Sequence, residues 1–140
     1  MKNIEYNLAS DSWGNEEVSA INEVIKSNRY TMGPKVKKFE KEFASYFNSE
    51  YAIMVNSGSS ANLLSVFASC NPLRKNRFKP GDEAIIQGLC WSTSLWPLVQ
   101  AGLKPKFVDV EKNTLNVDPE KLISAISKKT AFRKAQSTYK

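Results

Sequence analysis

Three short apolar runs, each followed by a stretch with helical spacing, constrain the fold of this chain more than any other feature. They occupy residues 51–55 (YAIMV), 84–87 and 105–110. The first of them is almost wholly apolar, as is typical of a parallel strand that is covered on both faces. The alternation of strand and helix therefore predicts an α/β fold with a mostly parallel sheet and helices on both of its faces.

Two helices are expected before the first apolar run. Apolar residues three and four positions apart predict an amphipathic helix that ends near Ser27 and Asn28. These residues are Val18, Ile21, Val24 and Ile25. A second helix is predicted to begin at Pro34, because the first helical residue does not need its N–H, and to bury a stripe that includes Phe39 and Phe43.

Further helices are expected after each apolar run. Helical signals follow from Ser59, and a short helix is predicted over 94–101, where Pro97 is tolerated if it lies in the first turn. A longer helix opens with Asp118 as a plausible N-cap and Pro119 behind it, and it should close near residue 127. The pattern then requires another apolar strand, but residues 128–140 read KKTAFRKAQSTYK. Residues 131–140 are therefore predicted to be an atypical, disordered tail.

Composition excludes several classes of protein. The 140 residues suit one domain, and no apolar run is long enough to cross a bilayer, so a cytoplasmic protein without a membrane partner is expected. Cys70 and Cys90 lack metal-ligand spacing and the chain contains no histidine, so no metal site is predicted. The net charge of +6 is scattered along the chain, which favours phosphate-bearing small molecules over nucleic acid.

A serine-rich turn joins the first apolar run to a helix. In VNSGSSANLL, the sequence places Gly58, Ser59 and Ser60 where the free N–H groups of a first helical turn favour an anion. Serine hydroxyls add donors, and glycine allows a close approach of the backbone. The alternative is that Ser59 or Ser60 only caps the helix.

An aromatic residue follows the second apolar run. Trp91 should lie beyond the carboxyl end of that strand, where open parallel sheets bind ligands, and its indole suits stacking on a flat ring. The alternative is a core position for Trp91; Trp96, inside the next helix, is expected in the core or an interface. A turn suited to bind phosphate and an indole suited to stack on a flat ring, on neighbouring loops, together suggest pyridoxal phosphate.

Several blocks in this order resemble the DegT/StrS family of nucleotide-sugar aminotransferases, which have PLP fold type I. The blocks are YTMGPKVKKFEKEFASYF, YAIMVNSGSSANLL, KPGDEAII, WSTSLWPLVQAGLKPKFVDV and NTLNVDPEKL. YTMGPKVK, WSTSLWPL and FVDVEKNTLNVD look most like the branch of GDP-4-keto-6-deoxymannose 3-dehydratases and hexulose 3-dehydrases. The resemblance implies that residues 1–130 are the N-terminal part of an incomplete PLP-dependent large domain, ended by truncation or a shifted reading frame.

The resemblance also implies roles for particular residues. Gly58, Ser59 and Ser60 would hold the phosphate of pyridoxal or pyridoxamine 5′-phosphate, and Trp91 would stack on its pyridine ring. Asp109 is interpreted as structural, since a strand-end aspartate often caps a turn. Residues 30–33 match a family segment beside the active-site mouth.

The family's Schiff-base lysine, or the histidine that replaces it, belongs to later sequence, so no catalytic residue is assigned and the chain alone is expected to be inactive. The implied function is 3-dehydration of a nucleotide-linked 4-keto-6-deoxyhexose in deoxysugar biosynthesis, such as that of lipopolysaccharide O-antigen. The substrate is then a nucleotide sugar, and the full-length protein is a homodimer. The alternatives are a sugar aminotransferase of the same family and a non-catalytic phosphate-binding module.

Overall fold

The computed structural model describes residues 11–130. These residues form two compact units, one that ends at Met54 and one that begins at Val55. Each unit has its own set of elements, so each is described separately. The predicted tail over 131–140 lies outside the described residues.

The first unit contains two helices, α1 (Asn15–Ser27) and α2 (Pro34–Tyr46), as the sequence predicts. The N–H of Gly14 before α1 donates to Glu17 Oε2 at 2.7 Å, and α1 ends at Asn28 with a left-handed φ of 51°. α2 has Pro34 in its first turn, where a missing N–H costs nothing. Local sequence thus explains where both helices begin and where α1 ends.

Little of this unit is buried. Three phenylalanines of α2 and its C-cap stack in a row, with ring centroids 5.4 Å apart for Phe39 and Phe43 and 4.7 Å apart for Phe43 and Phe47. All three remain exposed, and Ala44 is the only apolar side chain buried in the described part of this unit. The apolar stripe that the spacing predicts is therefore present, but its side chains are hardly buried.

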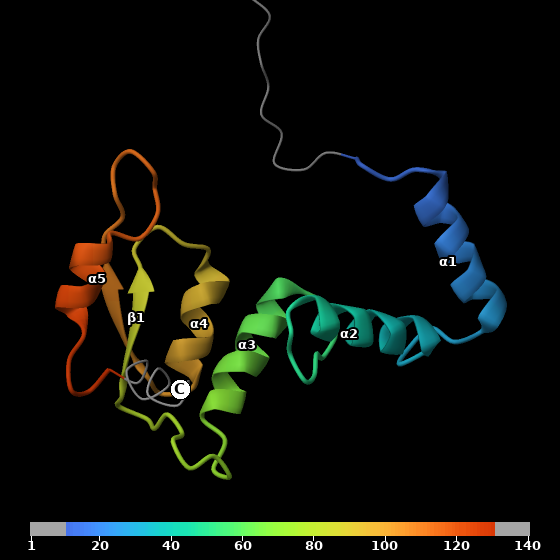
Figure 1. Ribbon diagram of the computed structural model, residues 1–140. Helices are drawn as coiled ribbons and strands as arrows, with labels where there is room; N and C mark the ends of the chain where they lie inside the picture. Colours follow the sequence, from blue (N-terminus) through green and yellow to red (C-terminus); the bar gives the residue numbers. More distant parts are fainter. Residues whose placement is uncertain (1–10, 131–140) are drawn as a thin grey trace, which may run out of the picture. The chain divides into compact units, whose positions relative to one another are not determined.

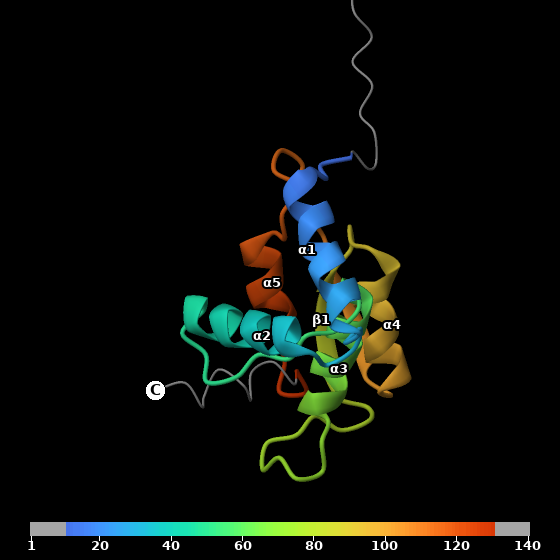
Figure 2. The same ribbon diagram turned by 90° about the vertical axis from the view of Figure 1, so that its right-hand side faces the viewer.

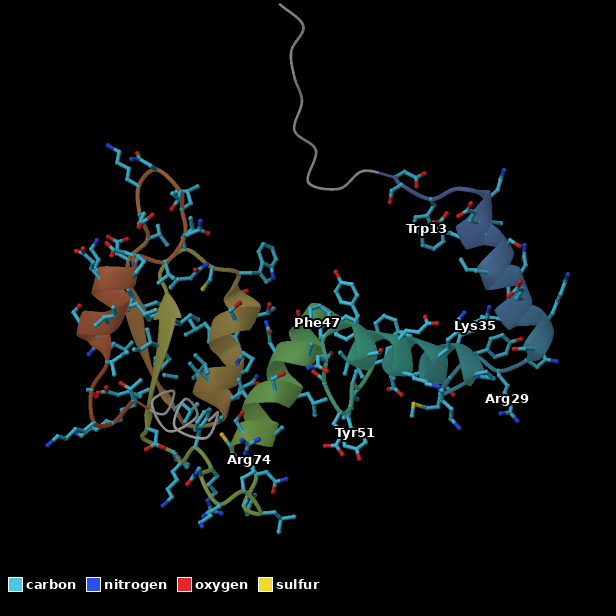
Figure 3. The ribbon with its side chains drawn as sticks, viewed as in Figure 1. Trp13, Arg29, Lys35, Phe47, Tyr51 and Arg74 are labelled. Carbon is cyan, nitrogen blue, oxygen red and sulfur yellow. The ribbon has the colours of Figure 1, made fainter. Side chains whose placement is uncertain are left out.

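The predicted strand over residues 51–55 is not formed. This segment pairs with no other strand among the described residues. Tyr51, labelled in Figure 3, is 79% exposed and Ile53 is 72% exposed. The Met54 N–H donates to Glu40 Oε1 at 2.9 Å instead of to a neighbouring strand. The prediction was wrong for a physical reason, since an apolar run becomes a strand only where a partner satisfies its backbone groups.

The second unit is a small three-layer α/β arrangement. Its sheet consists of β1 (Glu83–Gln87) and β2 (Lys104–Val108), paired in parallel with Glu83 opposite Lys104. Figures 1 and 2 show α4 (Ser92–Gln100) on one side of the sheet and α5 (Pro119–Ala125) on the other, and α3 (Gly58–Ser69) packs on α4. This confirms the predicted incomplete α/β fold with helices on both faces.

The core of this unit lies around β2 and α5. Leu103, Val108 and Ala125 are buried, and Thr130 is only 1% exposed. Pro105 is acceptable in β2 because the bonds to β1 are made by its neighbours on the ladder, so the missing N–H faces away from β1. Burial here depends on contacts between segments far apart in the sequence.

Several predicted boundaries in this unit change. The strands begin one residue earlier than predicted. The second ends at Val108, and Val110 beyond it forms an isolated antiparallel bridge with Val117. α4 begins at Ser92, so Pro97 is its sixth residue, beyond the first turn, and is buried. α5 ends at Ala125, while its N-cap Asp118 accepts from the N–H groups of Glu120 and Lys121 as predicted.

Candidate functional site

The serine-rich turn forms the N-terminus of α3. Ser57 is the N-cap: its Oγ accepts from the Ser60 N–H at 3.2 Å and lies 3.1 Å from Ser60 Oγ, while its carbonyl accepts from the Ala61 N–H. The sequence offered Ser59 or Ser60 as the capping residue, and the structure assigns that role to Ser57. Ser59 is thereby left available for other contacts.

Two backbone donors at this terminus remain unused within residues 11–130. No hydrogen bond from the N–H groups of Gly58 or Ser59 forms in that part of the chain. Apart from the adjoining residues and the backbone of α3 itself, no atom of residues 11–130 lies within 4 Å of the place that a Cβ on Gly58 would occupy. The chain's own packing therefore does not require glycine at this position, and the space over the first turn of α3 is open to a ligand.

A shallow pocket of about 200 Å³ adjoins this turn. Ser59, Ser60 and Leu63 of α3 line one wall. The other wall is the face of α4 formed by Thr93, Trp96, Pro97 and Gln100. Trp96 was expected in the core or an interface; it is half exposed and lies at this pocket. The wall residues of α4 are spaced by three, one and three positions, a helical-face pattern that was visible in the sequence.

Trp91 lies at the N-cap of α4, directly beyond the carboxyl end of β1. Its side chain is 72% exposed, so in the described structure it does not fill the core. It does not line the pocket that contains Ser59 and Ser60. The structure thus brings Trp96 rather than Trp91 to the serine turn, and it leaves the indole of Trp91 free to meet a ligand.

Asp109 has a structural role at the end of β2, as the sequence suggested. Its Oδ1 accepts from the Val110 N–H at 2.9 Å and its Oδ2 lies 3.2 Å from Lys121 Nζ. The Val110 N–H first, and then Lys121, hold the pKa of Asp109 below its usual value, and the same contact raises the pKa of Lys121. Both groups are exposed, so the pair stabilises the turn only slightly.

The segment 30–33 connects the two helices of the first unit. The Tyr30 hydroxyl donates to Asn28 Oδ1 at 3.0 Å, and Met32 adopts a left-handed φ of 47° before the buried Gly33. Beside it lies a mostly apolar pocket of about 210 Å³ at whose edge Lys35 Nζ pairs with Glu23 Oε2 at 2.6 Å.

Other kinds of site find no support in the described part of the chain. Between residues 11 and 130, no group of three acidic, cysteine or histidine side chains gathers where it could hold a metal ion. No helix there is long and apolar enough to cross a membrane. Cys70 and Cys90 are both free and half-buried, and burial raises the pKa of the Cys70 thiol, which makes it less reactive.

Comparison with known proteins gives one consistent result. The sequence profile of the DegT/DnrJ/EryC1/StrS aminotransferase family matches residues 11–135. GDP-4-keto-6-deoxy-D-mannose 3-dehydratase of Yersinia pseudotuberculosis is 50% identical over 127 residues, which are 91% of this chain and 32% of the relative.

Solved structures agree with the sequence comparison. The GDP-4-keto-6-deoxy-D-mannose-3-dehydratase of E. coli, solved with bound hydrated PLP, superposes with a TM-score of 0.82 at 48% identity. The superposed region covers 91% of this chain and 32% of the E. coli protein. An aminotransferase from Psychrobacter cryohalolentis superposes with a TM-score of 0.68 at 30% identity and covers 85% of this chain and 29% of that one. The chain thus spans about a third of the length of the relatives it matches.

Proposed function

Because this chain belongs to the DegT/DnrJ/EryC1/StrS aminotransferase family, we propose that it forms the N-terminal part of an enzyme that uses pyridoxal or pyridoxamine 5′-phosphate. The proposed substrate is a nucleotide-linked 4-keto-6-deoxyhexose, and the proposed reaction is its 3-dehydration. The observation that carries the proposal is the joint occurrence of a 50% identical 3-dehydratase and an open, donor-rich turn at the start of α3.

The serine turn is proposed to hold the cofactor phosphate. The N–H groups of Gly58 and Ser59 and the hydroxyls of Ser59 and Ser60 are donors at the positive end of the α3 dipole, which favours a dianion. The open space over Gly58 lets the phosphate approach the backbone. Ser57 is already engaged as the cap, and we assign it the role of holding this turn in shape.

Trp91 is proposed to stack on the pyridine ring. Its exposure and its place beyond the carboxyl end of β1 support this role, since a flat ring bound there would cover an indole that the chain itself does not cover. When bound, the cofactor supplies the electron sink for the reaction, and the chain's residues bind and orient it. No catalytic acid or base is assigned within this chain.

A hybrid protein tests these roles. Residues 1–130 of this chain are joined to the part of the Yersinia pseudotuberculosis relative that follows its matched region, and the cofactor retained on purification is measured by absorbance. Replacing Ser59 and Ser60 together by alanine should abolish retention, while Ser124→Ala on α5 should leave it unchanged. A folded hybrid that binds neither cofactor form would contradict the proposal.

Trp91→Ala in the same hybrid should weaken cofactor retention roughly five- to tenfold, since stacking contributes about 1 kcal/mol. Trp13→Ala, which removes another exposed indole, is the matched control. Unchanged affinity together with lower thermal stability would instead assign Trp91 a packing role.

The sugar aminotransferase remains the second candidate, because the Psychrobacter cryohalolentis structure is an aminotransferase of the same fold. The distinguishing position is a lysine for transamination and a histidine for 3-dehydration, and it lies beyond the residues of this chain. Sequencing the DNA downstream of codon 130 in all reading frames distinguishes the two reactions. A cytoplasmic homodimer is part of the same proposal and is supported by the family resemblance.

A further inference from the structure

The charges of the second unit are scattered along its sequence, yet the fold gathers them at the two ends of the sheet with different signs. Residues 109–121, beyond the carboxyl end of β2, carry more acidic than basic side chains. The acidic ones are Asp109, Glu111, Asp118 and Glu120, and the basic ones are Lys112 and Lys121. The start of α3 and Trp91 lie at this same end (Figure 1). The positive charge of the unit therefore does not surround the proposed cofactor site.

The opposite, amino end of the sheet is basic. It includes the loop over residues 71–81, between α3 and β1, which contains four basic residues and no acidic one. The basic residues of this loop are Arg74, Lys75, Arg77 and Lys79, and Arg74 is labelled in Figure 3. Lys104 begins β2 at this end, and Lys128 and Lys129 lie beside the start of β1. Basic residues from three segments of the chain are thus gathered at one end.

The two acidic residues at this end are engaged by their own neighbours. Asp82 Oδ2 accepts from the Lys79 N–H at 3.0 Å, and Glu83 Oε2 accepts from the Ser127 hydroxyl at 2.5 Å. Within residues 11–130, the ion pairs include none of the four basic side chains of the loop. The charge of the loop is therefore free to attract an anionic surface outside the chain.

The loop is anchored by its backbone and exposes an apolar side chain. The Phe78 N–H donates to the Ser69 carbonyl at 3.0 Å, and the Gly81 N–H donates to the Gly102 carbonyl at 2.8 Å. Leu73, next to the first basic residue of the loop, is 93% exposed. The basic loop thus combines positive charge with an aliphatic group that no other described part of the chain covers.

We propose that the basic loop over residues 71–81 docks the protein on the surface of an anionic lipid bilayer. Clusters of four or more Lys and Arg residues are typical of segments that bind acidic headgroups, and Leu73 is suited to enter the boundary between headgroups and acyl chains. The expectation of no membrane partner concerned a spanning run, which surface binding does not need. The inference goes beyond the proposed function and does not depend on it.

The chemistry of the loop favours lipid over nucleic acid. Proteins that bind single-stranded nucleic acid combine basic groups with exposed aromatic side chains on which the bases stack. Phe78 is the one aromatic residue of the loop, and it is half-buried and lines an apolar cavity with Ile85 and Leu98. The exposed apolar side chain is instead the aliphatic Leu73.

Docking through this loop leaves the proposed cofactor site accessible. α3 has 12 residues, so its two ends lie about 18 Å apart. The serine turn is at the start of this helix and the basic loop follows its end. A bilayer that contacts the loop therefore leaves Ser59 and Trp91 on the far side of the second unit.

Sedimentation with lipid vesicles tests the proposal. The complete 140-residue chain is mixed with vesicles of phosphatidylcholine alone, or of phosphatidylcholine with about a third of the anionic lipid phosphatidylglycerol. The chain should sediment with the anionic vesicles and not with the neutral ones. Binding should weaken as salt is added, because salt screens the attraction between exposed charges.

Two variants with the same net charge separate the loop from the overall charge of the chain. In the loop variant, glutamine replaces Arg74, Lys75, Arg77 and Lys79. In the control variant, glutamine replaces four basic residues of the first unit, namely Lys26, Arg29, Lys37 and Lys41. The loop variant should bind anionic vesicles at least about tenfold more weakly than the control variant. If circular dichroism shows that the loop variant is unfolded, the exposed pair Arg74→Gln and Lys75→Gln replaces it, with Lys37→Gln and Lys41→Gln as control.

Leu73→Ala tests the apolar part of the contact. It should weaken binding to anionic vesicles roughly three- to tenfold without changing the salt dependence, because it removes buried apolar area but no charge. Unchanged binding would contradict insertion of Leu73 and would leave a loop that attracts any polyanion.

Four further results would overturn the proposal. The first is no sedimentation with anionic vesicles at low salt. The second is equal loss in the loop variant and its control, which would assign binding to net charge alone. The third is tighter, loop-dependent binding to single-stranded RNA, which would make nucleic acid the partner. The fourth is a hybrid protein that retains cofactor but does not bind vesicles. A hybrid that binds vesicles without retaining cofactor supports this proposal and contradicts only the proposed function.

Discussion

The two units of this chain respond differently to the same kind of sequence signal. In the first unit, α1 and α2 form where helical spacing predicts them, yet Phe39 and Phe43 stay exposed. In the second unit, Leu103 and Val108 are buried within the layers of sheet and helices. Helix formation needs only local bonds, whereas a core needs segments distant in sequence to meet. The comparison shows that a helix can form where the sequence predicts it without its apolar face becoming buried.

The largest expected effect is a difference in hydrogen exchange between the two apolar runs. The Ile86 amide faces β2 in a paired strand, while Ile53 lies in a segment without strand pairing among the described residues. A difference of about 3 kcal/mol in opening free energy corresponds to about a hundredfold in exchange rate. Strong protection of Ile53 in a monomer would break the comparison, because it would show that residues 51–55 have found a partner.

Truncating one apolar side chain in each unit should give unequal results. Leu103→Ala removes a side chain that is 5% exposed and should lower the free energy of unfolding of the second unit by about 2–5 kcal/mol. Phe39→Ala should cost less than about 1 kcal/mol in the first unit, because the ring is already half exposed. Denaturant titration of each variant measures both, with the 93% exposed Leu73 changed to alanine as a neutral control.

The helix caps should also distinguish the units. Asp118 caps α5 through its side chain, so Asp118→Ala should destabilise the second unit by about 1 kcal/mol, and Asp118→Asn should retain most of the stability. α1 has Gly14 as its N-cap, so Gly14→Ser should gain only a few tenths of a kcal/mol. Thermal unfolding followed by circular dichroism checks both. A large gain in stability from Gly14→Ser would show that the helix caps, rather than the missing core, limit the stability of the first unit.

Relief of left-handed backbone strain should change the stability of both units by similar amounts. Met32 in the first and Leu115 in the second are exposed and left-handed, with φ of 47° and 58°. Glycine relieves about 1–2 kcal/mol of left-handed strain but loses about 0.5–1 kcal/mol through chain entropy. Met32→Gly and Leu115→Gly should therefore each stabilise slightly, and Leu73→Gly, where φ is not positive, should not. Equal destabilisation at all three positions would remove strain as the explanation.

The smallest expected effect is on the pH dependence of two exposed ion pairs. Lys35 is the main cause of the lowered pKa of Glu23, whereas the Val110 N–H is the main cause for Asp109. Lys35→Met should therefore return the pKa of Glu23 close to its ordinary value, while Lys121→Met should raise the pKa of Asp109 only in part. Because both folded pKa values are depressed, each carboxylate contributes stability above its unfolded pKa, and this is lost as pH falls through the folded pKa. Carbon-detected NMR titration measures the shifts, and equal shifts in the two variants would contradict the assignment of causes.

The sequence alone determined the elements whose causes are local. Pro34 at the start of α2, Asp118 at the start of α5 and the left-handed Asn28 after α1 follow from short-range rules of capping and backbone geometry. The α/β class and the family followed from the order of short motifs. The prediction that Asp109 serves a turn also came from its position at a strand end.

Only the tertiary structure decided which residues meet. Residues 51–55 read as a buried strand, but the partner that would make them one is not among the described residues. Ser57 rather than Ser59 or Ser60 caps α3, and Trp96 rather than Trp91 lines the pocket at that helix. The physical reason is that periodicity records which side chains share a face, while strand pairing, cap choice and pocket lining depend on the segments that pack against that face.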